Sequence, residues 1–173
     1  MKLHSILAVL VSTQVPVAIC SALQQSLSSM SQVHGHVKNV HKAVESYNGG
    51  IMDLVKLSYA SNNLDRAIDE AMQHNSQREP LDADEFEHYS KSFDEFHPAV
   101  VETMRALGRK ASHFKSTGSK TGNRIVIQAI KQRQEEFLDS IRKSVHEDNV
   151  TALDTGCEDI DSAFRDTYDE FWL

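Results

Sequence analysis

One pair of residues in the sequence has the spacing found in metal-binding helices. Glu85 and His88 form an E-x-x-H pattern, which places a carboxylate and an imidazole on the same helix face. Bundles that bind two metal ions need two such pairs and two further carboxylates. No second pair accompanies this one, because the other histidines lack the matching glutamate: Ala71 stands three positions before His74, Asp94 before His97 and Lys143 before His146. The sequence therefore predicts no metal site and no cofactor.

Other patterns that support catalysis are incomplete. Residues 118–121 read Gly-Ser-Lys-Thr, but a phosphate-binding loop needs glycine where Phe114 and Ser119 stand and a strand before it. No G-x-S-x-G turn for a nucleophilic serine is present. Cys157 lies in an acidic segment, which disfavours a reactive thiolate. We therefore expect a protein without catalytic residues that is not an enzyme.

The charge balance argues against nucleic acid as a partner. The chain has 173 residues and a net charge of −7, whereas affinity for nucleic acid depends on neutralising phosphates with lysine and arginine. Ten of the 18 basic residues lie between Arg105 and Lys143, and an acidic segment follows from Glu147 to Glu170. We interpret the two regions as faces of neighbouring helices that attract each other.

The elements that must position any site are amphipathic helices. Apolar residues recur at steps of three and four, the period of one helix face, over five segments that start near residues 23, 51, 83, 124 and 150. Asp82 and Glu85 predict a capping box at the third helix, which we expect to continue to Phe114. Only 7 Gly and 3 Pro are present, which leaves little turn chemistry for a sandwich or barrel. The sequence predicts an all-α, up-and-down bundle of four or five helices.

Two sites interrupt the helical pattern. Asn48 is followed by Gly49-Gly50, and glycine readily adopts the positive φ that ends a helix. Pro98 falls inside the third helix, where it removes a hydrogen bond and clashes with the carbonyl group of Asp94. We expect kinks near Gly49-Gly50 and near Pro98, and bent helices leave space between them.

The first twenty residues differ from the rest. Lys2 is their one charged residue, an apolar run follows at residues 6–11, and Ala18 and Cys20 supply small side chains. This layout predicts a secretory signal peptide at residues 1–20, cleaved after Cys20 or Ala22, and a single domain at residues 21–173. The apolar run is too short to span a bilayer. Asn149, in the sequence Asn-Val-Thr, is a predicted glycosylation site of a secreted protein.

Aromatic residues are concentrated on two of the predicted helices, four at residues 86–96 and four at residues 164–172. If the bent helices do not close completely, the apolar slot between them can hold a fatty-acid chain, because burying about 14 methylenes contributes on the order of 10 kcal/mol before the costs of association. We predict that the slot is lined by Phe93, Phe96, Met104, Phe137, Ile141 and Phe164.

Four stretches, in order along the chain, resemble the secreted fungal family that includes hydrophobic surface-binding protein A and the cell-wall galactomannoproteins. These stretches are residues 47–50 (Tyr-Asn-Gly-Gly), residues 80–84 (Pro-Leu-Asp-Ala-Asp), residues 107–110 (Leu-Gly-Arg-Lys) with Phe114 and Gly118, and residues 160–164 (Ile-Asp-Ser-Ala-Phe) with Tyr168. The resemblance implies an extracellular, non-enzymatic helical domain that adsorbs to hydrophobic surfaces or binds fatty acids in a tunnel. It also implies secreted hydrolases as partners, or a place in the cell wall as a glycoprotein.

Two functions from different classes follow. The first is a secreted protein that binds a fatty acid, another apolar ligand or a hydrophobic surface. The alternative is a structural cell-wall or host-interaction glycoprotein with a solid core. The sequence lacks a Ser/Thr/Pro-rich stalk and a hydrophobic anchor signal, which favours release to the medium over attachment to the wall.

Overall fold

The computed structural model describes the backbone of residues 15–117 and 120–172, and the side chains of residues 23–116 and 128–172. It contains six helices: α1 (Val15–Glu45), α2 (Ile51–Ser76), α3 (Ala83–Arg109), α4 (Ala111–Thr117), α5 (Lys120–Lys143) and α6 (Glu147–Trp172). Five are long and α4 has seven residues. The predicted all-α fold is confirmed.

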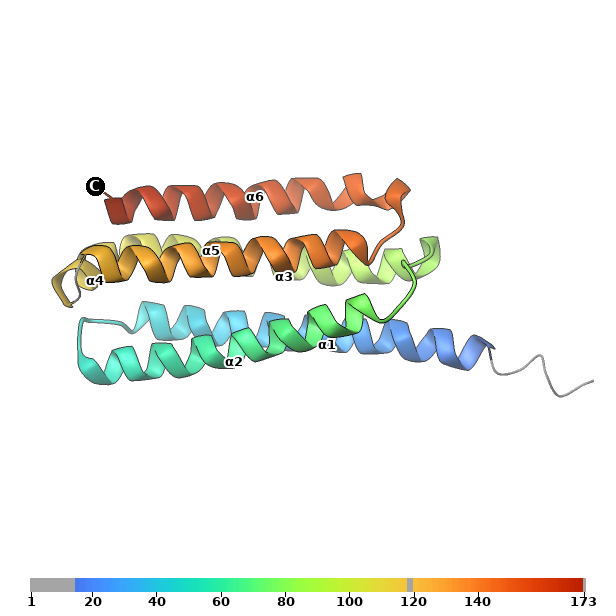
Figure 1. Cartoon of the computed structure of the whole chain (residues 1–173), viewed down its shortest axis with the longest axis horizontal. Helices are drawn as coiled ribbons and strands as arrows, with labels where there is room; N and C mark the ends of the chain where they lie inside the picture. The colour runs from blue at the N-terminus through green and yellow to red at the C-terminus, as the bar shows by residue number, and fades with distance from the viewer. Residues whose placement is uncertain (1–14, 118–119, 173) are drawn as a thin grey trace, which may run out of the picture.

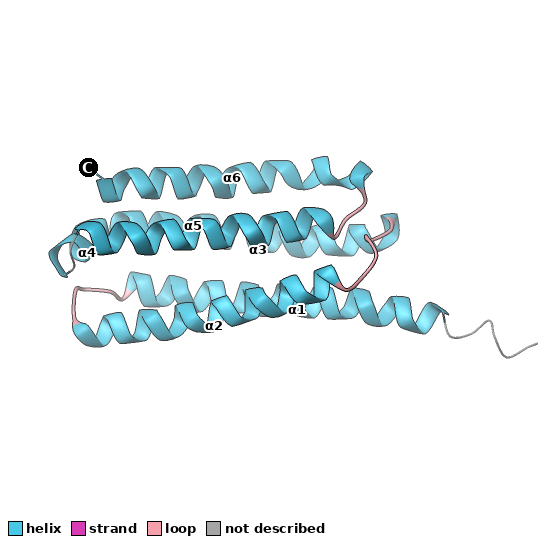
Figure 2. Cartoon of the chain, in the orientation of Figure 1, coloured by secondary structure: helices cyan, strands magenta, loops and turns pink. Residues whose placement is uncertain are grey.

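The five long helices run up and down along one direction (Figure 1). The α1–α2 turn, α4 and the end of α6 lie at one end of the bundle, and the α2–α3 and α5–α6 connections lie at the other. Loops are short and confined to the two ends (Figure 2). At the second end the N–H group of Leu81 donates a hydrogen bond of 3.0 Å to the carbonyl oxygen of Ser144. This contact joins the two connections.

Two of the predicted local signals act as helix boundaries. Gly49 has a φ of 90°, so Gly49-Gly50 forms a chain reversal between α1 and α2. At the start of α3 the side chain of Asp82 accepts a hydrogen bond of 2.9 Å from the N–H group of Glu85. The Glu85 carboxylate in turn accepts one of 3.3 Å from the N–H group of Asp82. The predicted capping box is therefore confirmed.

The third predicted helix differs from the structure at its C-terminal end. It was expected to continue to Phe114, but α3 ends at Arg109 and α4 starts at Ala111. The break falls at Lys110, whose N–H group donates to the carbonyl oxygens of Ala106 and Leu107. Pro98 lies inside α3, and the helix continues through it. The kink expected there stays a prediction.

The largest group of buried side chains joins α1, α2, α3, α5 and α6. In this core Phe96 of α3 meets Phe137 of α5 edge to face, with ring centroids 5.8 Å apart. A smaller cluster lies at the end that holds the α1–α2 turn and consists of Tyr47, Ala111, Phe114 and Phe171. Cys157 is fully buried in the main core, and this burial raises the pKa of its thiol.

Most of the predicted signal peptide lies outside the described residues, which begin at Val15. Residues 15–20 form the start of α1, so the predicted cleavage and the domain boundary stay predictions. Asn149 lies half-buried in the first turn of α6, and its glycosylation also stays a prediction. Within the described part of the chain, no helix is both long and apolar enough to cross a membrane.

Candidate binding cavity

A cavity of about 500 Å³ lies between the helices. This volume falls in the range of 300–1,000 Å³ that is typical of small-molecule sites. Its walls come from every helix of the bundle and are mainly apolar. They comprise Val33, Val37, Val40 and Val44 of α1; Leu54, Leu57, Ser58, Ser61, Asn62, Leu64, Asp65 and Ile68 of α2; Phe96, Val100, Thr103, Met104 and Leu107 of α3; Phe114 of α4; Ile130, Arg133, Gln134 and Phe137 of α5; and Phe164 and Phe171 of α6.

The α1 wall explains why the space exists. Its four lining residues are all valine and follow one another at steps of four, three and four, so they form one stripe on the helix. Valine is short and its χ1 angle is restricted, so these side chains fill less of the space between α1 and the aromatic residues of α3, α5 and α6 than leucine or phenylalanine would. The helices pack around the gap instead of closing it.

Four of the six predicted lining residues lie on the cavity wall, namely Phe96, Met104, Phe137 and Phe164. Phe93 and Ile141 are buried in the main core instead and are not among the lining residues. The ring of Phe93 packs against Gly156 of α6, and Ile141 lies one turn beyond Phe137, toward the end with the α5–α6 connection. Ligand contact by any of the six stays a prediction.

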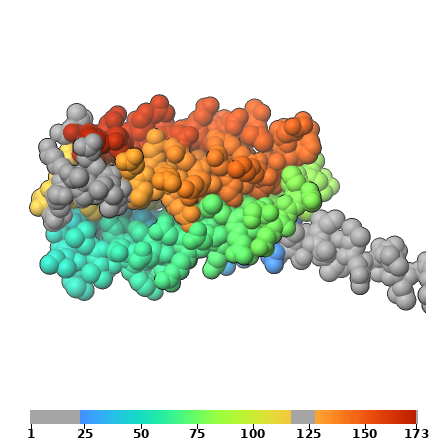
Figure 3. Space-filling view, viewed as in Figure 1, coloured from blue at the N-terminus to red at the C-terminus, as the bar shows by residue number. Residues whose placement is uncertain are grey.

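The cavity is partly open, and its exposed lining residues show where. Leu54, Ser58, Asn62 and Asp65 on α2 and Ile130 on α5 are both exposed and part of the wall. The exposed part of the wall therefore lies where α2 and α5 border each other, and Figure 3 shows these two helices side by side on one face of the molecule. Sequence reasoning missed this mouth because its α2 side is formed largely by polar residues that interrupt the apolar pattern.

Arg133 of α5 holds the two helices together beside the mouth. Its guanidinium group pairs with the carboxylate of Asp69 on α2 and lies 3.2 Å from an Oε atom of Glu136. Partial burial lowers the pKa of Arg133, but the hydrogen bonds to Asp69 and Glu136 outweigh this effect and raise it overall. Arg133 is therefore a fixed cation on a mouth that also carries the acidic side chain of Asp65.

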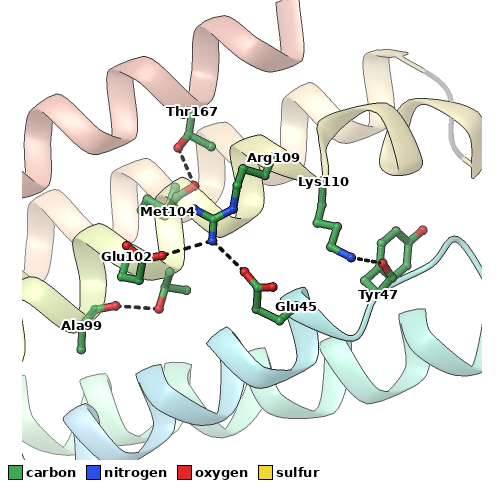
Figure 4. Close-up of polar contacts among 9 residues, drawn as sticks. Glu45, Tyr47, Ala99, Glu102, Met104, Arg109, Lys110 and Thr167 are labelled. Carbon is green, nitrogen blue, oxygen red and sulfur yellow. Dashed lines mark hydrogen bonds and ion pairs between the residues drawn. The ribbon is translucent and has the colours of Figure 1, made fainter.

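Aromatic packing closes the cavity at the end with the α1–α2 turn. The rings of Tyr47 and Phe114 stack with centroids 4.1 Å apart, and Phe171 lies 5.8 Å from Phe114. Lys110, at the break between α3 and α4, donates a hydrogen bond of 3.0 Å to the carbonyl oxygen of Tyr47 (Figure 4). The helix break at Lys110, which the sequence pattern did not predict, thus places Phe114 of α4 where its ring stacks on that of Tyr47.

An ion-pair network reinforces the same end (Figure 4). The guanidinium group of Arg109 lies 2.7 Å from the carboxylate of Glu45 on α1 and 3.1 Å from that of Glu102 on α3. The hydrogen bond from Arg109 lowers the pKa of Glu45. All three side chains are largely exposed, so the network aligns α1 with α3 and adds little to stability.

The comparisons with known proteins agree with this architecture. The family model for hydrophobic surface binding protein A matches residues 23–143. The chain belongs to this family. The resemblance drawn from the four sequence stretches is therefore confirmed. No curated protein is a significant match at the level of sequence.

Three solved structures have the same fold as this member of the hydrophobic surface binding protein A family. AfMP4p in complex with palmitic acid has a TM-score of 0.79 at 16% identity, over 86% of this chain and 99% of that one. Ligand binding domain 2 of Penicillium marneffei MP1 protein in complex with arachidonic acids has a TM-score of 0.75 at 16% identity, over 87% of this chain and 92% of that one. Ligand binding domain 1 of the same protein, complexed with arachidonic acids, has a TM-score of 0.74 at 12% identity, over 83% of this chain and 94% of that one.

The residues of the E-x-x-H pattern do not converge with other metal ligands in this family member. The Glu85 carboxylate is engaged in the capping box, and His88 is exposed. Among the residues that the structure describes, no group of three or more His, Cys, Asp or Glu side chains could hold a metal ion. The cavity offers apolar contact and a polar mouth, which suits binding.

Proposed function

We propose that this protein binds a long-chain fatty acid or a similar lipid in the apolar cavity between its helices, without covalent chemistry. The observation that carries the proposal is the partly open, apolar cavity of about 500 Å³. Three structures that share the fold, from two proteins, are complexes with palmitic or arachidonic acid, which supports the same class of ligand here. The alternative function, a structural glycoprotein with a solid core, does not fit a cavity of this size.

The physical basis of the proposed binding is burial of the hydrocarbon chain. Each methylene transferred from water to an apolar site contributes about 0.8 kcal/mol. The valine stripe of α1 and the aromatic side chains of α3, α5 and α6 supply such a site. The mouth places polar groups, among them Ser58, Asn62 and Arg133, where the head group meets water. A bundle with this cavity thus binds the ligand mainly by its tail.

Thermal unfolding tests the proposal. Palmitic or arachidonic acid at 100 times its Kd should raise the Tm by about 5–10 °C, because binding then adds about 2.7 kcal/mol and each kcal/mol moves the Tm of a domain of this size by about 2–4 °C. Butyric acid is the control, since its chain is too short to fill the cavity. Mass spectrometry of the gently purified protein should also detect a bound lipid. If neither long-chain acid shifts the Tm and no lipid co-purifies, the proposal is wrong.

We also propose that the protein is secreted and released from the cell, where secreted hydrolases that act on apolar material are candidate partners. The support is the predicted signal peptide at residues 1–20 and the sequon at Asn149. When the whole chain is expressed in a secreting yeast, the intact mass of protein from the medium should correspond to a chain that begins at Ser21 or Leu23. Endoglycosidase treatment should reduce that mass, and Asn149→Gln should abolish the reduction. A mass that still includes residues 1–20 would contradict the cleavage.

A further inference from the structure

Five large apolar side chains are exposed on the first three turns of α2. They are Ile51, Met52, Leu54, Val55 and Tyr59, with exposed fractions of 81%, 68%, 39%, 56% and 71%. We call these five residues the α2 patch. Single exposed apolar residues are common on proteins, whereas a contiguous group indicates a surface that meets an apolar partner. The buried contacts of α2 come from other residues, chiefly Ala60, Ala67, Ile68 and Ala71.

The α2 patch is continuous with the mouth of the cavity. A shallow surface groove runs over the patch and is lined by Ile51, Leu54, Val55, Ser58, Tyr59 and Asn62. Three of these residues, Leu54, Ser58 and Asn62, also line the cavity. An apolar chain that leaves the cavity beside α2 therefore crosses the patch before it reaches water.

The charge around the patch limits the kind of partner. Lys56 lies 3.9 Å from Asp53, so the two charged residues within the patch segment compensate each other. The whole chain is acidic, with a net charge of −7, which disfavours an anionic surface at long range. The patch includes Tyr59, and an exposed tyrosine ring with its polar hydroxyl group suits the boundary between lipid and water. These properties fit a neutral lipid surface.

A second protein chain fits the patch less well. A stable protein interface usually engages about 20–30 residues on each side, whereas the α2 patch has five large side chains within nine residues of one helix. Such a small surface can insert between lipid head groups, where apolar side chains gain contact without a matched partner surface.

We propose that the α2 patch docks on the surface of a neutral lipid bilayer, and that the ligand passes directly between the bilayer and the cavity through the adjoining mouth. The transfer step rests on the proposed function, whereas the docking step does not. The patch thus has a role distinct from that of the cavity wall: it brings the opening to the lipid and removes the need for a free fatty acid in water.

The test uses the triple variant Ile51→Gln, Val55→Gln, Tyr59→Gln. These three residues are exposed and are not among those that line the cavity, so the fold and the equilibrium affinity for ligand should be retained. The matched control is Arg66→Gln, Glu70→Gln, which changes two exposed residues of the same helix without changing the net charge. All proteins are purified from the medium of a secreting host, and stability is checked by thermal unfolding.

Docking is measured first, by flotation with vesicles of palmitoyl-oleoyl phosphatidylcholine in the absence of fatty acid. Wild type and control should float with the vesicles, and binding of the triple variant should fall at least about 10-fold, because each large apolar side chain removed costs about 1.5 kcal/mol or more of burial. If the wild type does not float, or if the triple variant floats as the wild type does, the docking is wrong. If sedimentation shows a wild-type dimer that the triple variant dissociates, the patch joins two copies and the proposal is overturned.

Transfer is measured second, with a fluorescent fatty acid moving from protein to the same vesicles. For the wild type the rate should rise in proportion to the vesicle concentration, as expected when transfer requires collision. The triple variant should transfer the fatty acid to the vesicles at least about 10-fold more slowly, although its affinity for the fatty acid is unchanged. The reason is the same as for docking: the variant loses the apolar side chains that are buried in the bilayer. A wild-type rate that is independent of vesicle concentration would overturn direct transfer. Absence of any fatty-acid binding would instead contradict the proposed function, while flotation still decides the docking.

Discussion

Replacing Val40 by tryptophan should lower the affinity for palmitic acid by about 100-fold without unfolding the bundle. Val40 is the third residue of the valine stripe on α1 and lines the cavity. An indole ring at this position projects into space that three or four methylenes of the ligand would occupy, and losing their burial costs about 3 kcal/mol. The side chain enters an existing gap, so the protein itself should lose little stability or none.

The same substitution at Val55 is the control. Val55 lies on the outer side of α2, is 56% exposed and is not a lining residue, so Val55→Trp should keep the equilibrium affinity of the wild type within about 2-fold, as surface changes usually do. Isothermal titration with palmitic acid gives the affinities, and chemical unfolding gives the stabilities. If Val40→Trp is stable and binds palmitic acid as tightly as the wild type does, the ligand does not occupy this cavity.

The sequence predicted the helices well because their determinants are local. Steps of three and four in apolar residues define one face of a helix, and the chemistry of Asp82 with Glu85, or of Gly49, acts within a few residues. The end of α3 was missed for the opposite reason. No proline follows Arg109, and the break at Lys110 is held by contacts with residues far away in the chain, such as the hydrogen bond to the carbonyl oxygen of Tyr47.

The cavity could be predicted only in part, because it depends on volumes summed across several helices. The aromatic residues Phe96, Phe137 and Phe164 were identified as lining residues from their helix faces alone. The valine stripe of α1 was not among the predicted lining residues, although all four of its side chains lie on the cavity wall. Phe93 was predicted to line the cavity because it is one turn from Phe96. Its ring lies instead in the contact between α3 and α6, where the glycine at position 156 leaves room for it.

Gly156→Leu should lower the free energy of unfolding by about 3 kcal/mol, near the upper end of the usual cost of overpacking a core. A Cβ atom on Gly156 of α6 would lie 2.6 Å from Cε1 of Phe93 and 3.1 Å from Cγ of His97, both on α3. Phe93 is 1% exposed, so its ring has no open space to move into. A leucine there must push α3 and α6 apart, and the Tm should fall by about 6–12 °C.

Gly35→Leu is the matched control, because the residue lies inside a helix in both cases and only the surroundings differ. Outside the backbone of its own helix, a Cβ atom on Gly35 of α1 would meet nothing within 4 Å, so leucine adds no clash and should stabilise the protein by about 0.5–1 kcal/mol through its higher helix propensity. If both variants unfold at the same temperature, close packing at Gly156 does not set the distance between α3 and α6. Opposite shifts would show that the close approach of α3 and α6 depends on the absence of a side chain at position 156. With α3 and α6 packed this closely, the exposed part of the cavity wall lies on the other side of the bundle, on α2 and α5.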